Sequence, residues 1–551
     1  MPPDLLDPQL IFICALAAVV SLLATATVAS RPSALITRRV ALSVTIFQIF
    51  FMVARFANLF YLPVLGHYVD EAIASGRVDL LLFKIRIIVG GAAFGGLLAW
   101  LLLPTMVELF VRGIRSMESH KSMIRVLLRL FRPSSWRKAL GSLRRPSFMG
   151  VSPWRLDGIP VGFLIFNVLA GAIWTVGVLS AMYVSAIHPE QATTAVLLSG
   201  LVNAFAAIAF SVLVDPKAAL ITDQALAGER PERHVAATAV WLAGGNFLGN
   251  LLGQAFLEPA NRIIEHATLA LGSGGGFLVG NLGLVVGINA LVTLLASTTV
   301  VSRISAVITR RVATAIAIYN LFFLVTRLAQ QIYAPVLGTI RDHAIRTGDS
   351  AGLAGKFQLI VLGATVGVVL GWMLMPTFVE VYKKAILGLD RLGSVPALLW
   401  ETAMPRSWHA LLSCIRRPSL YGVRFSHIAE IPRHFLWANV LVISIYTIGV
   451  MAATYASALE PGLARTAALL SSVVNGVATV ALSLVVDPTS ALLTDQAVAG
   501  QRPHRHIYIM AVFLTVGTLV GTCLSQLLLE PAARVILMGA HLIDLLFHTG
   551  G

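Results

Sequence analysis

Six apolar stretches of about 20 residues, each long enough to cross a membrane as a helix, fill the first half of this chain. They lie near residues 9–30, 40–62, 80–103, 159–187, 192–214 and 234–256. Adding 272 to each range lands on a second set, and the register holds without a gap. Pro63 then pairs with Pro335, Pro104 with Pro376, and "RRPS" at 144 with "RRPS" at 416. We therefore predict two tandem copies of one six-helix unit.

The composition excludes a water-soluble globular protein. The 551 residues are 57% hydrophobic and 12% charged, whereas soluble domains have roughly 25% charged residues. The three cysteines, Cys14, Cys414 and Cys523, share no repeat-equivalent position, which argues against a disulfide framework or a thiolate metal site. No metal or other cofactor is predicted.

The predicted fold is an all-α polytopic membrane protein with about 12 transmembrane helices in two parallel six-helix repeats, residues 1–272 and 273–551. Because each repeat has an even number of spans, both enter the membrane in the same sense, and a pseudo-two-fold axis along the membrane normal should relate them. The "GSGGG" at 272–276 is predicted to be a flexible join. It lacks the Lys and Ser/Thr of a phosphate-binding P-loop.

Basic residues predict the orientation. One set of alternate loops holds 30 of the 41 Lys and Arg residues, and the opposite set holds 6. Because translocation of basic loops is disfavoured, the rich set should be cytoplasmic and both termini outside. The net charge of +15 is thus assigned to the membrane surface and not to nucleic acid. The long basic loops are expected to form amphipathic helices on the anionic leaflet, or else only to fix the orientation.

A polar unit follows the fifth span of each repeat. It is "VDPKAALITDQALAGERP" from 214 and "VDPTSALLTDQAVAGQRP" from 486. Asp215 suits a helix N-cap, Pro216 the first turn and Gly228 a left-handed closing residue, which predicts a short capped helix whose Ala225 and Leu226 enter the membrane interface. Its carboxylates are candidates for gating or proton sensing: Asp215, Asp223, Asp487 and Asp495. The alternative is a plain connector in which Asp223 pairs with a nearby arginine.

The second span of each repeat contains an arginine, Arg55 or Arg327. Such a residue costs roughly 3 kcal/mol to insert and therefore needs a partner. It either holds helices together or binds an anion, for which the forked guanidinium is suited. Further amides are candidates for lining a wet cavity with it: Gln48, Asn58, Asn320, Gln330, Asn167, Asn439, Asn203, Asn475, Gln254 and Gln526.

Three basic residues near the predicted outer ends of the third spans have two interpretations. Lys84, Arg86 and Lys356 either snorkel to the membrane surface or form an exit site.

Three features together resemble the Amj family of bacterial lipid II flippases. They are the arginine-bearing second span that ends in "PVLG", the "VDP…TDQA" unit, and the closing "Q…LLLEPAA" at 526–533. The resemblance implies transport of an undecaprenyl-pyrophosphate-linked cell-wall precursor to the outer leaflet of the bacterial cytoplasmic membrane, with membrane lipids as neighbours. Family members typically hold one copy of this repeat, so the fused pair suggests a monomer that acts as an internal pseudo-dimer.

Other functions stay open at this stage. A secondary transporter of a small anionic solute would share the two-repeat plan. An enzyme is not expected, because the sequence has no HExxH motif, no paired acidic metal motif and no convincing nucleophile with a base. A non-transporting scaffold would have little reason to keep charged residues inside its spans. No nucleotide-binding motif is present, which leaves an ion gradient, the membrane potential or product removal as the driving force.

Overall fold

The structure is a computed structural model that describes residues 7–38, 40–120, 141–152, 156, 158–226, 228–309, 312–349, 352–392, 395–419, 421–498 and 500–548. Every regular element in these ranges is helical. The chain separates into two compact units, Met1–Leu269 with Leu542–Gly551, and Ala270–His541. Each unit is described by itself below.

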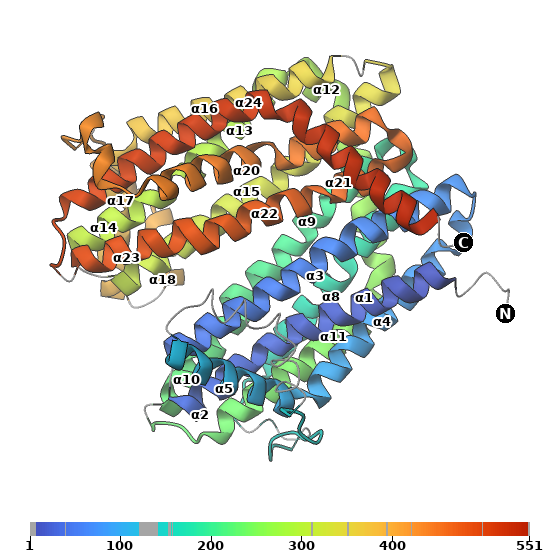
Figure 1. Ribbon diagram of the computed structural model, residues 1–551, viewed down its shortest axis with the longest axis horizontal. Helices are drawn as coiled ribbons and strands as arrows, with labels where there is room; N and C mark the ends of the chain where they lie inside the picture. The colour runs from blue at the N-terminus through green and yellow to red at the C-terminus, as the bar shows by residue number, and fades with distance from the viewer. Residues whose placement is uncertain are drawn as a thin grey trace. The chain divides into compact units, whose positions relative to one another are not determined.

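The helices occur in the same order in both repeats (Figure 1). In the first repeat they are α1 (Pro8–Ala26), α2 (Ser30–Thr37), α3 (Val40–Ala74), α4 (Leu81–Leu101), α5 (Leu103–His120), α8 (Val161–Ile187), α9 (Ala192–Ala209), α10 (Asp215–Leu226) and α11 (Arg233–Ser273). In the second they are α12 (Gly275–Gly280), α13 (Leu282–Ser297), α14 (Val301–Thr309), α15 (Val312–Thr347), α16 (Leu353–Met373), α17 (Met375–Leu392), α18 (Val395–Ala403), α19 (Pro405–Leu412), α20 (Arg433–Leu459), α21 (Ala464–Leu469), α22 (Ser471–Ala481), α23 (Asp487–Val498) and α24 (Arg505–His548).

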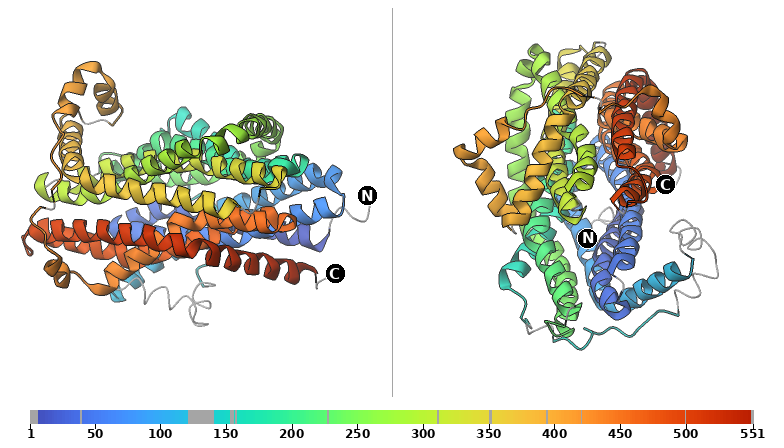
Figure 2. Two further views of the ribbon diagram at one scale, coloured as in Figure 1. Left: turned by 90° about the horizontal axis from the view of Figure 1, so that it is seen from above. Right: turned by 90° about the vertical axis from the view of Figure 1, so that its left-hand side faces the viewer.

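The predicted helix count is confirmed, since the described residues include 12 helical segments long and apolar enough to span a membrane. In the second repeat the axes of these long helices are roughly aligned with one another (Figure 2). The last span of each repeat is much longer than expected, because α11 and α24 continue through Pro259 and Pro531.

Glycines let two helices of each repeat touch backbone to backbone. A Cβ on Gly95 of α4 would lie 2.0 Å from the Ala18 carbonyl oxygen of α1, and a Cβ on Gly367 of α16 would lie 2.2 Å from that of Ala290 on α13. Gly91 makes the same kind of approach one turn earlier. Close packing of this type holds membrane helices together without a hydrophobic driving force.

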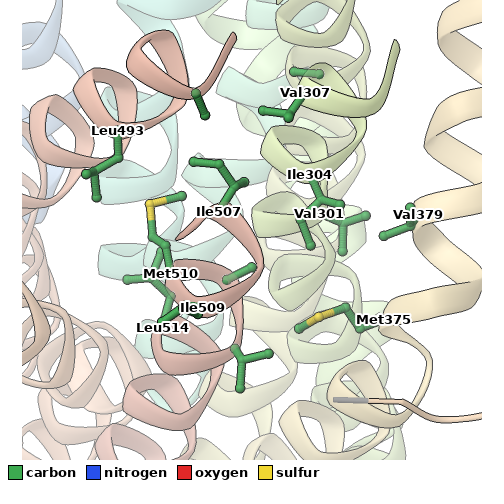
Figure 3. Close-up of a cluster of buried hydrophobic side chains, with 14 of the residues drawn as sticks. Val301, Ile304, Val307, Met375, Val379, Leu493, Ile507, Ile509, Met510 and Leu514 are labelled. Atoms are coloured by element: carbon green, nitrogen blue, oxygen red, sulfur yellow. The ribbon is translucent and has the colours of Figure 1, made fainter. Parts of the chain in front are cut away.

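We call the end of each repeat that carries the lysine- and arginine-rich loops its basic end. In the second repeat an apolar cluster packs the helices together at this end (Figure 3). Val301 and Ile304 of α14 face Met375 of α17, and Ile507 and Met510 of α24 complete the cluster, all at most 2% exposed. This packing fixes the start of α17, where Thr377 hydrogen-bonds the backbone of Arg416.

The unit after the fifth span is not a separately capped helix. Asp215 has the helical angles φ −60° and ψ −42°, because α9 continues into α10 through a π-helical turn, Phe210–Val214. A second π-turn, Leu482–Val486, leads into α23. The predicted left-handed Gly228 is confirmed at φ +79°. Ala225 is 2% exposed against Leu35 and Val235, so it packs inside the protein and not in the membrane interface.

Two other expectations concern connecting segments. The "GSGGG" join is largely helical, because α11 runs to Ser273 and α12 begins at Gly275. The long basic loop of the second repeat does contain short helices, α18 and α19, whose Trp400 and Trp408 are 70% and 60% exposed. The corresponding stretch 121–140 lies outside the described residues.

The substitution Gly95→Val tests the backbone contact. The added side chain would force α1 and α4 apart, and overpacking of this kind costs about 1–3 kcal/mol. We expect a lower unfolding temperature of the purified protein in detergent. Gly90→Val is the control, because a Cβ there would meet nothing within 4 Å; equal losses in both variants would contradict a specific contact.

Candidate functional site

The two second spans form long helices that place their arginines in mid-helix. Arg327 on α15 is exposed at the surface of its repeat, with its guanidinium carbon 5.7 Å from the centre of the Phe323 ring one turn earlier. Gln330, three residues on, is also exposed. This cation and amide therefore share one accessible face of the second repeat.

The first repeat carries the equivalent residues on α3. Asn58 is exposed there. The side chains of Arg55, Gln48 and Asn320 lie outside the described part of the structure. The exposure of the arginine is thus observed on α15 and stays a prediction on α3, and the binding role of both residues stays a prediction.

The paired asparagines of the fourth spans do not line a cavity. Asn167 is 1% exposed and donates to the Leu242 carbonyl at 3.1 Å, and Asn439 donates to the Leu514 carbonyl at 3.0 Å. Each amide bridges the fourth span to the sixth, so its role is to hold the bundle. A neighbouring glycine, Gly245 in the first repeat, leaves room for it.

Asn203 and Asn475 lie between the fourth and fifth spans. Their Oδ1 atoms would be 2.4 Å and 2.1 Å from a Cβ on Gly177 and Gly449, respectively. Both oxygens are buried without a hydrogen-bond partner among the described residues. An unpaired buried acceptor in matching positions calls for a donor from water or a ligand.

Gln254 has a structural partner. Its Nε2 donates to the Arg86 carbonyl at 2.7 Å, and Arg86 in turn donates to the Gln254 carbonyl and pairs with Glu258 at 2.7 Å. These bonds tie α4 to α11, so Arg86 does not simply snorkel. Gln526 on α24 is half-buried, and the residue equivalent to Arg86 is Gln358, so the tie is not repeated.

The four carboxylates of the polar units are only partly described. Asp215 pairs with Arg31 of α2, and the side chain of this arginine is 19% exposed. Beside it, Arg38 pairs with Glu232 at 2.9 Å and also donates to the Leu226 carbonyl. The side chains of Asp223, Asp487 and Asp495 lie outside the described part. In the first repeat, then, α10 is fastened to α2 by charge at the basic end.

Sequence reasoning missed the ion pair of the buried Lys84. Lys84 of α4, 6% exposed, lies with its Nζ 2.9 Å from Oδ2 of Asp7, to which the Tyr68 hydroxyl also donates at 2.9 Å. The equivalent Lys356 pairs instead with Asp349 at 2.5 Å. An apolar helix with one inward lysine signalled the need for a partner, but the partner is 77 residues away in sequence.

The described residues contain no group of three or more His, Cys, Asp or Glu side chains that could hold a metal ion.

Lys84→Met tests the ion pair between Lys84 and Asp7. Removing one member leaves the Asp7 carboxylate without its cation, which costs about 3 kcal/mol. The double variant Asp7→Asn with Lys84→Met should recover most of the loss in thermal unfolding measurements. A double variant as unstable as Lys84→Met alone would contradict the pairing.

Comparison with known proteins finds one matching family and a relative within it. A family model described as "Amj: Alternate to MurJ" matches residues 16–268 and again 286–540, which correspond to the two repeats. A Bacillus subtilis (strain 168) protein named "Lipid II flippase Amj" is 33% identical over 226 residues, which are 41% of this chain and 84% of that relative. No solved structure gives a significant match.

Proposed function

This chain belongs to the Amj (Alternate to MurJ) family, and from that membership we propose that it is a flippase for a lipid II-type precursor of the cell wall. The observation that supports this most strongly is that the family model matches both repeats over nearly their whole length. The substrate carries a pyrophosphate and sugars on a polyprenyl tail. The tail can stay in lipid, whereas the headgroup needs a polar route across.

The physical requirement is a set of polar partners inside an apolar medium. Unsatisfied polar and charged groups cost several kcal/mol each in hydrocarbon. The exposed Arg327 with Gln330 supplies a cation and an amide on one helix face. We assign the same role to Arg55 with Asn58 and Gln48, and to Asn320 in the second repeat. The guanidinium fork matches pyrophosphate oxygens.

Arg327→Gln and Arg55→Gln test the binding role. Losing a charge-assisted hydrogen bond to pyrophosphate removes about 1.5–3 kcal/mol, so headgroup transfer should fall roughly tenfold or more. The measurement is movement of labelled lipid II across the bilayer of proteoliposomes that contain the purified full chain. Arg77→Gln, in the loop after α3, is the control. Normal transfer by both span variants would remove these arginines from the substrate path.

A secondary transporter of a small anionic solute is the alternative that exposed arginines also permit. The same proteoliposomes distinguish the two functions. Competition by soluble phosphate compounds but not by polyprenyl-linked lipids would favour the solute, and the reverse pattern would favour the flippase.

We propose that the polar units gate the basic end. A π-turn leads into the unit in each repeat, and π-turns are frequent at functional sites because they weaken the regular helix ladder. The ion pair between Asp215 and Arg31 then acts as a latch on a hinged helix. Asp487, Asp223 and Asp495 are assigned to the same gate by their equivalent or neighbouring positions.

Asp215→Asn tests the latch. Without the carboxylate charge, α10 is held less firmly to α2, and hydrogen exchange of its amides should increase several-fold while those of α8 stay unchanged. Glu229→Gln is the control, because it changes an exposed acidic residue in the turn that follows α10. Unchanged exchange of α10 would rule out the latch, and normal transport at every pH would rule out proton sensing by this residue.

We propose that the protein lies in the bacterial cytoplasmic membrane with both termini outside. The excess of basic residues in alternate loops supports this orientation. The two fused copies support a monomer that works as an internal pseudo-dimer, with transport and not catalysis as its activity.

A further inference from the structure

A second duplicated motif lies at the basic end of each repeat and has no role in the proposed route through the spans. It is "RRPSFMG" at 144–150 and "RRPSLYG" at 416–422, identical at five of seven positions. We call these segments the RRPS loops. Residue 420 lies outside the described part.

Each RRPS loop is held by hydrogen bonds to a threonine. The Arg144 N–H donates to Thr105 Oγ1 at 3.0 Å, and this hydroxyl donates back to the Arg144 carbonyl at 3.4 Å. Thr377 holds Arg416 through the same two bonds, at 3.0 Å and 3.3 Å. The first arginine of each loop is thus fixed by its backbone to the helix that follows the third span, α5 or α17.

A second tie lies just before each loop. Arg112 donates to the Gly141 carbonyl at 3.0 Å, and the equivalent Lys384 donates to Ser413 Oγ at 2.7 Å. Different basic residues therefore perform the same task. Both copies keep the start of the loop rigid.

The end of each RRPS loop is strained in the same way. Met149 and Tyr421 have φ of +50° and +53°, and the glycine after each also has a positive φ. In the first repeat a hydrogen bond from Val151 N–H to the Phe148 carbonyl at 2.9 Å closes the turn. Non-glycine residues in this conformation cost about 1–3 kcal/mol and gather at binding sites. Because both repeats keep this strained conformation at equivalent positions, we infer that the function of the loop requires its shape.

The second arginine of each loop has no acidic partner among the described residues. In the first repeat Glu108 pairs with Arg112 at 2.8 Å and Arg144 at 3.3 Å, and these guanidinium groups lower the pKa of its carboxyl. Arg145 and Arg417 are exposed and pair with no acidic side chain of the described residues. In the first repeat the loop therefore presents one guanidinium without an acidic partner, that of Arg145. In the second repeat Arg416 is also exposed without an acidic partner among the described residues, but it donates to the Ser413 carbonyl at 3.3 Å.

An open pocket of about 250 Å³ lies beside the RRPS loop of the second repeat, lined by Trp372, Met373, Pro418 and Ser419. The indole N–H of Trp372 is buried and has no hydrogen-bond partner among the described residues. A water molecule takes about 30 Å³ of liquid, so the space admits a group as large as a phosphate. Trp100 repeats the unpaired indole N–H in the first repeat, where Phe148 packs on its ring.

We propose that the RRPS loops are phosphate-binding loops that take the pyrophosphate of the polyprenyl-linked substrate at the basic end, before it meets the arginines of the second spans. Arg417 supplies the charge, and the Ser419 hydroxyl and Trp372 indole supply neutral donors. Arg145 with Ser147 is the counterpart in the first repeat. The proposal rests on the proposed function for the identity of the lipid, while the loop chemistry recognises a lipid phosphate in general.

The test measures binding and not transport. The full-length protein in nanodiscs of phosphatidylcholine is titrated with a polyprenyl pyrophosphate that lacks sugars, in competition with phosphatidylglycerol. Arg417→Gln should weaken binding about tenfold, and the double variant Arg145→Gln with Arg417→Gln should weaken it further. Arg424→Gln is the matched control, since it removes the same charge from an exposed residue two positions beyond the loop and should leave the affinity unchanged.

Trp372→Phe keeps the ring and removes only the N–H, so it should weaken binding about threefold without changing thermal stability. Equal losses in Arg417→Gln and Arg424→Gln would reduce the effect to bulk charge and overturn the proposal, as would unchanged affinity in Arg417→Gln. Full competition by phosphatidylglycerol would assign the loops to ordinary anionic lipids and overturn the substrate assignment. Loop-dependent binding by a protein that moves no lipid II would refute the flippase and leave the phosphate loops standing.

Discussion

Backbone contact between the first and third spans is the constraint on which each repeat is built. In a membrane, apolar side chains gain little by moving from lipid into a helix interface, because both are apolar. Helices therefore associate where their backbones approach closely and where they form hydrogen bonds. Gly95 and Gly367 meet the carbonyl oxygens of Ala18 and Ala290 at distances that no side chain would permit. The second span then packs against the first span of this pair, because α1 also contacts α3 and α13 contacts α15. The mid-helix arginine thus lies on a helix that packs against one member of this pair.

The demand that buried polar groups be satisfied shapes the rest of each bundle. The two repeats often meet it with different residues. At the C-terminal end of the fourth span, His188 pairs with Glu265 at 2.8 Å, whereas the equivalent position of the second repeat is Glu460, which pairs with His541 at 2.8 Å. Because the acid and the base have exchanged helices, the contact between the fourth and sixth spans is what matters, and not either residue alone.

Hydropathy and register were enough to predict the spans, the duplication and the polar motifs, because these depend on local composition and on a fixed offset. The partners of buried polar groups could not be predicted. Asn167 bonds a main-chain carbonyl 75 residues away, and main-chain acceptors leave no mark in a sequence. The π-turn before Asp215 was equally hidden, since "DP" suits a helix start and nothing in the residues requires the preceding helix to continue.

The two ends of the bundle differ in how far the copies have diverged. At the end of α4 near Lys84, the copies use different partners, and the second repeat adds a buried pair, Arg341 with Asp342, where the first has Val69 and Asp70. At the opposite end, the RRPS sequence, its threonine tie and the strained turn are the same in both. A purely structural end would tolerate exchange of partners, as the contacts near Lys84 do. The RRPS loops stay alike although the ties next to them differ, which supports the proposal that both loops perform the same chemical task, the binding of a lipid phosphate.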